Sequence, residues 1–295
     1  MPHFESEYEL LVNLVEDYQR CFGVEVPFEL LDSLCIESAI DALKTAIGTR
    51  TPLLERDPLI PFLDQKTSGS VGQRSRSDPF RRLRRKMVLE QLSVDDWPVT
   101  NRRVIGAMEH VPREEFVPPE LRPHAYEDRA LPIGHGQTLS QPYIVGLMTE
   151  LINPRPHDLI LEVGTGSGYQ AAILAELASH VWSMEIRHEL AEKARSTLAR
   201  LSYTNVDVLE GDGYEGCPAL GTFDGIMMSC AAPKIPRPLL RQLKAGGKLI
   251  APLGSPQEQF LYLFIKTGNR LERMQVIPVR FVEMVTPHAE TACRS

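Results

Sequence analysis

The fold of this chain is decided by one stretch, Leu159-Ile-Leu-Glu-Val-Gly-Thr-Gly-Ser-Gly-Tyr-Gln-Ala-Ala-Ile-Leu174. An apolar run ends in a glycine-rich turn and then resumes with the pattern of an amphipathic helix. This is how a parallel strand delivers a cofactor to the start of a helix. The glycines at 164, 166 and 168 permit tight or left-handed backbone and leave no side chain in front of it. A ligand can therefore contact the main chain of this turn.

The spacing of the glycines alone leaves the class of ligand open. A dinucleotide fingerprint requires glycines at relative positions one, three and six. Counted from Gly164, position six is Tyr169; counted from Gly166, only the looser form that ends in alanine is met. Glycine-rich turns also occur in α/β folds as ordinary connections, without any ligand.

Three acidic residues narrow the choice. Glu162 lies inside the strand before the turn, and Glu185 ends the next apolar run, 21 residues after Gly164. The second strand of a βαβ unit places a ribose-binding carboxylate at that distance. Asp212 stands between two glycines after a third strand-like run. Together these residues outline an adenosine site without a pyrophosphate requirement, which suits S-adenosyl-L-methionine and its product S-adenosyl-L-homocysteine.

Strand-like and helical patterns alternate from residue 158 onward. The strand-like runs are 159–163, 181–186, 206–210, 223–229, 247–253, 260–266 and 275–282. Helical patterns occupy 169–179, 188–202 and 236–244. No helical pattern separates the last two strands, which predicts an antiparallel hairpin. The sequence therefore predicts an α/β class, with a doubly wound Rossmann-like sheet that ends in an antiparallel C-terminal hairpin.

The first part of the chain has a different composition. Residues 1–66 show apolar side chains at helical spacing and carry 13 acidic and 5 basic residues, a net charge of −8. Residues 67–79 have the composition of a flexible linker. We therefore predict a small helical N-terminal unit over 1–66, a linker over 67–79 and a catalytic domain over 80–295. The N-terminal unit is a candidate site for an unknown protein partner.

Charge and cysteine usage exclude several classes of protein. The chain after residue 66 has 26 acidic and 27 basic residues, a net charge of +1, which gives no reason to expect a nucleic-acid partner. The five cysteines form no Cys-x-x-Cys pair and have no histidine cluster nearby, so we expect reduced thiols and no metal site. The acidic start is unlike a signal peptide, and no apolar run approaches 18 residues. These features predict a cytoplasmic protein with no membrane association.

A second block of sequence lies ahead of the glycine turn, Ala130-Leu-Pro-Ile-Gly-His-Gly-Gln-Thr-Leu-Ser-Gln-Pro-Tyr143. With this block, the chain resembles the protein-L-isoaspartate O-methyltransferases over about residues 80–285. The glycine turn is common to many methyltransferases, whereas this block is highly specific to the family. The other matching segments are Val111-Pro-Arg-Glu-Glu-Phe-Val-Pro118, Ala125-Tyr-Glu-Asp128, Gly211-Asp-Gly213, Ala231-Ala-Pro233 and Leu243-Lys-Ala-Gly-Gly247.

The resemblance implies methyl transfer from S-adenosyl-L-methionine to the α-carboxylate of L-isoaspartyl residues in damaged proteins or peptides. The ester then cyclises to a succinimide, which hydrolyses partly to aspartate. Carried over by position, Ser140 is the active-site serine, and Gln137 and Thr138 bind substrate. The cofactor residues are Glu162, Gly164, Gly166 and Gly168 in the turn, Glu185 for the ribose and Asp212 for the adenine. A carboxylate with a pKa near 4 is already ionised at neutral pH, so we expect Ser140 to orient the acceptor and not to act as an acyl nucleophile.

One departure from the family and three alternatives stay open at this stage. The family usually has Phe-Val-Pro near its C-terminus, whereas this chain has Phe281-Val-Glu-Met284, so Glu283 replaces the usual proline. This change leaves the peptide preference undecided. The alternatives are a relative that esterifies an aspartate of one dedicated precursor peptide, a binding module that has lost turnover, and a nicotinamide oxidoreductase. Intact Ser140, Glu185 and Asp212 argue against the second, and the failed glycine spacing argues against the third.

Overall fold

The computed structural model describes residues 78–92, 97–268 and 270–285, together with the single positions Leu14, Asp17 and Lys44. The chain divides into two units, Met1–Ser77 and Asp78–Ser295. The helical unit predicted over 1–66 and most of the predicted linker lie outside the described residues, so that division of domains stays a prediction. The second unit contains the predicted sheet and the glycine turn.

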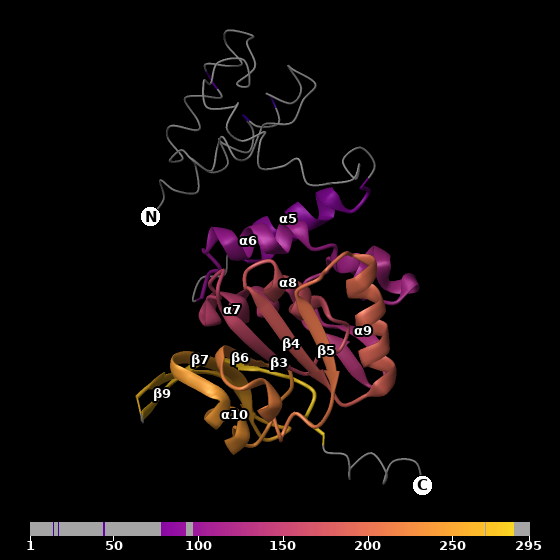
Figure 1. The fold of residues 1–295 in the computed structure, drawn as a ribbon. Coiled ribbons are helices and arrows are strands. Elements are labelled where there is room, and N and C mark those ends of the chain that lie inside the picture. The colour runs from indigo at the N-terminus through magenta and orange to yellow at the C-terminus, as the bar shows by residue number, and fades with distance from the viewer. Residues whose placement is uncertain are drawn as a thin grey trace. The chain divides into compact units, whose positions relative to one another are not determined.

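A seven-stranded sheet forms the centre of this second unit, in the order β5-β4-β3-β6-β7-β8-β9 (Figure 1). The strands are β3 Leu159–Val163, β4 His180–Glu185, β5 Val206–Glu210, β6 Phe223–Met228, β7 Leu243–Gly254, β8 Gln259–Thr267 and β9 Arg270–Val279. The pairs from β5 to β7 are all parallel, and β8 is antiparallel to both β7 and β9. The predicted parallel sheet with an antiparallel C-terminal hairpin is confirmed.

Helices cover both faces of this sheet because successive strand residues point to opposite sides. The helices are α5 Arg81–Gln91, α6 Arg102–His110, α7 Pro142–Ile152, α8 Tyr169–Ala175, α9 His188–Arg200 and α10 Arg237–Gln242. Ile160 of β3 belongs to the buried cluster that contains α7 and α8, whereas its neighbour Leu161 belongs to the cluster that contains Leu239 of α10. The result is the three-layer arrangement of a Rossmann-like fold.

Several predicted boundaries differ from the structure, and the largest difference is in β9, which was predicted over 275–282 but runs from Arg270 to Val279, because its first half is polar and exposed. The predicted helix 169–179 ends as α8 at Ala175, and the chain continues in a turn in which the Leu177 and Ala178 amides donate to the Leu174 carbonyl. Strand β7 begins at Leu243, four residues earlier than predicted, because a bulge lets Leu243 pair with Phe223 before the regular ladder starts. The sequence did not predict this early pairing, because the glycines at 246 and 247 interrupt the apolar pattern of a strand.

Short elements outside the sheet complete the described unit. A two-stranded hairpin, β1 Leu131–Gly134 and β2 Gln137–Leu139, precedes α7, and the 3-10 helices are η2 Arg113–Phe116, η3 Pro119–His124 and η4 Pro218–Leu220.

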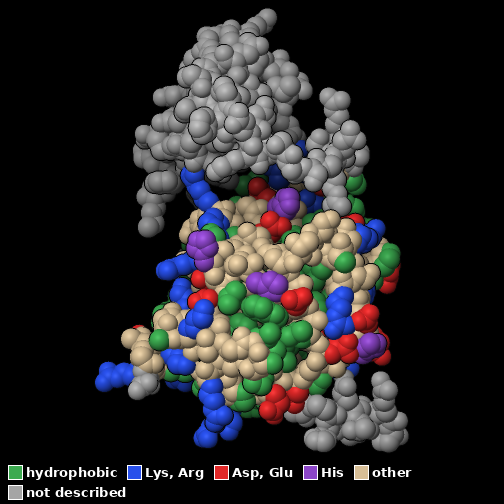
Figure 2. Space-filling model, in the orientation of Figure 1, with side chains coloured by type: hydrophobic (Ala, Val, Ile, Leu, Met, Phe, Trp, Pro, Cys, Tyr) green, Lys and Arg blue, Asp and Glu red, His purple; other side chains and the backbone are tan. Residues whose placement is uncertain are grey.

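On the face shown in Figure 2, basic and acidic side chains are interspersed, and hydrophobic side chains gather near its middle, over the strands. Within the described residues, no helix combines the length and apolar character needed to cross a bilayer.

Candidate active site

A cavity opens at the carboxyl ends of the parallel strands, where the strand order reverses between β3 and β6. Ligands of doubly wound folds bind at such switch points. The space in the cavity is about 860 Å³, open solvent at its mouth included. Its lining comes from the turn after β3, the end of β4, the β1–β2 hairpin, α7 and the segment after β9.

The glycine turn is held against β4 by main-chain hydrogen bonds. The Gly164 and Thr165 amides both donate to the Met184 carbonyl, at 2.8 and 3.1 Å. Gly164 and Gly166 have φ values of +98° and +54°, which favour glycine, and both line the cavity. Gly168 also has a positive φ, of +89°, but it caps α8, and a Cβ there would lie 3.3 Å from the Ala194 Cβ. Gly168 is therefore explained by backbone conformation and helix packing, and it does not line the cavity.

Glu185 lies at the end of β4 and connects that strand to the glycine turn. One carboxylate oxygen accepts from the Gly166 amide at 2.8 Å, and the other accepts from the Ile186 and Arg187 amides, each at 3.1 Å. A carboxylate offers about four acceptor positions, so these three amides use most of its capacity. The side chain is buried and lines the cavity. In this structure the Glu185 carboxylate holds the glycine turn to the end of β4 through these hydrogen bonds.

Glu162 is a fully buried carboxyl group in the floor of the cavity. Ser183 Oγ and Ser229 Oγ donate to its two oxygens, at 2.6 and 3.0 Å. Burial raises the pKa of Glu162 to about 8; the two serine hydroxyls oppose this rise and the nearby charge of Glu185 adds to it. The carboxyl group therefore keeps its proton in the folded protein at neutral pH.

The raised pKa of Glu162 predicts a pH dependence of stability. Between the ordinary value of 4.5 and about 8, the folded protein retains a proton that the unfolded chain has released. The free energy of unfolding should therefore fall as pH rises through this window, by at most about 1.4 kcal/mol per pH unit from this group. Glu162→Gln removes the contribution, so its stability relative to wild type should rise from pH 5 to pH 8 in urea unfolding. Glu258→Gln, at an exposed turn, is the control. Parallel profiles for wild type and Glu162→Gln would contradict the assignment.

Asp212 does not line the cavity, although Gly211 and Gly213 on either side of it do. Its carboxylate accepts from the Tyr214 amide at 2.9 Å, which stabilises the turn after β5. At Gly213 a Cβ would lie 2.4 Å from Val163 Cγ1 and 2.7 Å from Met284 Cε. Glycine is required there by packing, and the role of Asp212 beside an adenine stays a prediction.

The β1–β2 hairpin supplies the opposite side of the cavity. Gly134, His135 and Gly136 all have positive φ, so the hairpin reverses tightly and brings Gln137 and Thr138 to the cavity. Ser140 follows β2 and also lines the cavity, and among the described residues its hydroxyl has no hydrogen-bond partner. His135 occupies the reversal itself, as expected for a loop histidine. The sequence did not predict the hairpin, because its strands are only four and three residues long.

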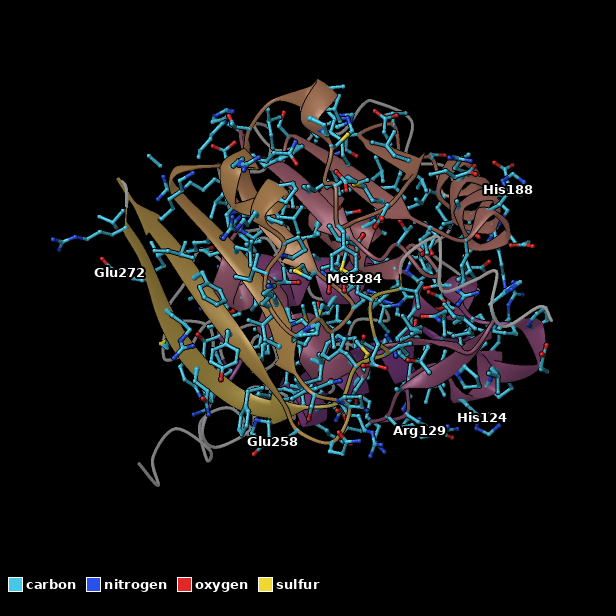
Figure 3. All side chains as sticks on the ribbon, turned by 90° about the horizontal axis from the view of Figure 1, so that it is seen from below. His124, Arg129, His188, Glu258, Glu272 and Met284 are labelled. Carbon is cyan, nitrogen blue, oxygen red and sulfur yellow. The ribbon has the colours of Figure 1, made fainter. Side chains whose placement is uncertain are left out.

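The segment after β9 closes the cavity and was not identified from the sequence as part of it. The Ala231 amide donates to the Val282 carbonyl at 2.9 Å, and the Met284 amide donates to the Ala231 carbonyl at 2.7 Å. These bonds hold Glu283, Met284 and Val285 in the lining. Viewed from below, Met284 lies near the centre of the described unit (Figure 3). The one feature of the sequence that pointed to this segment was the departure from the family motif at Glu283.

The cavity thus brings together seven of the nine predicted site residues, which are Gln137, Thr138, Ser140, Glu162, Gly164, Gly166 and Glu185. Cys230 and Arg187 are lining residues that the sequence did not reveal. The lining contains three glutamates and one arginine; because Glu162 retains its proton at neutral pH, Glu185 and Glu283 against Arg187 leave one net negative charge, which suits a cationic ligand better than a pyrophosphate.

Comparison with known proteins agrees with this geometry. Residues 83–289 match the family model described as protein-L-isoaspartate(D-aspartate) O-methyltransferase (PCMT). The chain belongs to this family. A relative from Nitrosococcus oceani, named protein-L-isoaspartate O-methyltransferase 2, is 51% identical over 189 residues, 64% of this chain and 86% of its own. One from Methanoculleus marisnigri, named protein-L-isoaspartate O-methyltransferase, is 47% identical over 71% of this chain and 94% of its own.

The fold of the family is seen in a solved structure from Plasmodium falciparum, named as a protein-L-isoaspartate O-methyltransferase in complex with S-adenosyl-L-homocysteine. It aligns with a TM-score of 0.60 and 24% identity over 71% of this chain and 99% of that one. The likeness confirms the Rossmann-like architecture of the described unit.

Proposed function

We propose that this protein transfers a methyl group from S-adenosyl-L-methionine to the α-carboxylate of L-isoaspartyl residues in damaged proteins or peptides. The methyl ester then leads to a succinimide and partly back to aspartate. The observation that carries the proposal is the meeting of two motifs in one cavity. The acidic glycine turn and the family-specific hairpin block line its two sides, in a chain that belongs to the protein-L-isoaspartate O-methyltransferases.

The cavity suits this cofactor by its charge and its open main chain. When bound, S-adenosyl-L-methionine supplies a methyl group activated on a sulfonium centre. Glu162, Gly164, Gly166 and Glu185 would hold it, because they offer a carboxyl group, a carboxylate and side-chain-free backbone on one side of the cavity. The Glu185 carboxylate, which accepts from the Gly166 amide, would repel the pyrophosphate of a dinucleotide. This argues against a nicotinamide oxidoreductase, and S-adenosyl-L-homocysteine is the product we expect to be released.

The protein residues have an orienting task and do not need to remove a proton. The acceptor carboxylate is ionised at neutral pH. Ser140, with its hydroxyl free to donate, would fix one acceptor oxygen, while Gln137 and Thr138 would hold the peptide near it. Glu283, Met284 and Val285 would exclude water from the reacting groups. Orientation and exclusion of water then supply most of the acceleration.

A direct assay tests the proposal. The full-length protein should transfer labelled methyl groups from S-adenosyl-L-methionine to a peptide that contains L-isoaspartate. A peptide of the same sequence with normal aspartate should accept at least about 100-fold less, because its carboxylate reaches a different position. Equal labelling of both peptides, or of neither, would contradict the proposal. The alternative of a dedicated precursor peptide is not favoured, since the relatives that match this chain are named for isoaspartate.

The N-terminal residues are proposed to act separately from transfer itself. Their net charge of −8 and the linker composition of 67–79 support an independent unit that binds an unidentified protein partner. In the same assay, a chain that begins at residue 79 should therefore keep activity on short isoaspartyl peptides. Loss of activity or solubility would show that residues 1–78 are needed by the catalytic domain. The lack of any Cys-x-x-Cys pair in the sequence, and the free Cys217 and Cys230 thiols among the described residues, support our further proposal of a cytoplasmic location.

A further inference from the structure

Arg113, in η2, is a fully buried cation just behind the candidate active site. Its Nε donates to the Ala125 carbonyl at 2.7 Å, and its Nη2 donates to the Ser140 carbonyl at 2.6 Å. The guanidinium carbon lies 4.9 Å from the centre of the Tyr169 ring. Among the described residues, Nη1 has no hydrogen-bond partner. Arg113 is thus held by two carbonyls and an aromatic face.

A second buried arginine nearby, Arg84, differs from Arg113 in having carboxylate partners. Arg84 is also buried, but its guanidinium lies 3.1 Å from Glu114 and 3.3 Å from Asp78. No carboxylate of the described residues forms an ion pair with Arg113. Burial lowers the pKa of Arg113, and the Tyr169 hydroxyl and ring are its nearest compensating groups. Burying a cation without a carboxylate is costly, so the presence of Arg113 at this position calls for a reason other than an ion pair.

The reason lies in what the guanidinium connects. Its N–H groups form a rigid planar fork, so two acceptors bound to it are held at a defined separation and orientation. One acceptor is the carbonyl of Ala125, which follows η3; the other is the carbonyl of Ser140, between β2 and α7. Holding the peptide plane after Ser140 restrains rotation about its Cα–C bond and so narrows the directions open to its Cα–Cβ bond. Arg113 thus influences the position of the Ser140 hydroxyl through the main chain of Ser140, without contacting the hydroxyl itself.

We propose that Arg113 is a positioning residue for methyl transfer, which acts by holding the main chain of Ser140 so that its hydroxyl faces the acceptor carboxylate. This rests on the proposed function, in which Ser140 orients the acceptor. A displacement of about 1 Å in an orienting group can cost about 100-fold in rate. Arg113→Lys keeps the charge but loses the fork, so it should release the Ser140 carbonyl or the Ala125 carbonyl.

A double-mutant cycle distinguishes positioning from a general structural role. We expect Arg113→Lys to lower kcat on an isoaspartyl peptide about 10- to 100-fold per folded site, with the Kd of S-adenosyl-L-homocysteine changed less than about 2-fold. In a Ser140→Ala background the same substitution should lower kcat less than about 2-fold further, because the group that it positions is gone. Sites are counted by the stoichiometry of S-adenosyl-L-homocysteine binding in calorimetry, which corrects for unfolded protein.

Arg84→Lys is the matched control. It perturbs the adjacent buried network, in which Arg84 donates to the Tyr126 hydroxyl and to Glu114, and it touches no part of Ser140. It should lower the melting temperature and leave kcat per folded site within about 2-fold of wild type. An equal loss of kcat in both arginine variants would overturn the proposal.

The other outcomes are also decisive. An equal effect of Arg113→Lys with and without the Ser140 hydroxyl would show a structural role and overturn the proposal, while methyl transfer by wild type would leave the proposed function intact. No transfer by wild type would instead refute the function. If Arg113→Lys yields no folded protein, a backbone ester between residues 140 and 141 weakens the same carbonyl as an acceptor with Arg113 retained. That variant should lower kcat at least about 5-fold, and an unchanged kcat would overturn the proposal.

Discussion

Ser140→Ala is expected to lower kcat on an isoaspartyl peptide about 10- to 1,000-fold, the upper end being the effect of losing an oxyanion-type donor. The hydroxyl lies in the cavity lining without a partner among the described residues, so a bound carboxylate would be its acceptor. An interaction formed in the transition state lowers kcat when it is lost, and the Kd of S-adenosyl-L-methionine should change less than about 2-fold. Single-turnover transfer and calorimetry measure the two quantities.

Ser179→Ala provides the control for that substitution. Ser179 is exposed and precedes β4, at the end of the sheet opposite the cavity, so its loss should leave kcat unchanged. If Ser140→Ala also retained the full rate, the backbone of the hairpin, and not the hydroxyl, would orient the acceptor.

Glu185→Ala is expected to weaken binding of S-adenosyl-L-methionine at least about 10-fold. Two losses contribute. The ribose would lose a charge-assisted acceptor, and the amides of Gly166, Ile186 and Arg187 would lose the carboxylate that now holds them. The second loss loosens the glycine turn before any ligand arrives, so the apo protein should also melt at a lower temperature. Calorimetry and thermal unfolding without cofactor separate these effects.

Glu210→Gln is the matched control for Glu185→Ala. Glu210 lies directly opposite Glu185 on the neighbouring strand but pairs with His188 and Arg195 and does not line the cavity. Its substitution should change cofactor affinity less than about 2-fold. Unchanged affinity in Glu185→Ala would show that the ribose assignment is wrong and that the carboxylate serves only the turn.

The sheet was predictable where its strands are short runs rich in apolar residues with turns between them, and less so at β9, whose first half is polar and exposed. Strands β3, β5 and β8 begin within one residue of their predicted positions. The spacing of apolar residues that marks a strand can be read within a few neighbouring positions, so one sequence is enough to locate these strands. The β1–β2 hairpin has no such spacing: β1 is four residues long and includes Pro132, and only the family resemblance pointed to that block.

The site was predictable where a motif supplies the lining and not where distant contacts do. Motif residues such as Glu162 and Ser140 reach the cavity, as the resemblance implies. Neighbouring residues of one motif can, however, have different roles, because some line the cavity and others only pack within the fold. Gly166 faces the cavity, whereas Gly168 faces Ala194 of α9. Met284 reaches the lining through a main-chain bond to Ala231, more than 50 residues earlier, and no local pattern reveals such a pairing.

That pairing sets the order in which the enzyme can become competent during synthesis. By the time β9 has left the ribosome, every strand of the large sheet and all the motif residues are available to fold. The cavity is still open on the side that Glu283, Met284 and Val285 will occupy. A nascent chain would therefore have its fold before it has an enclosed reaction site. The cavity would gain its last wall only when the Met284 amide pairs with the Ala231 carbonyl.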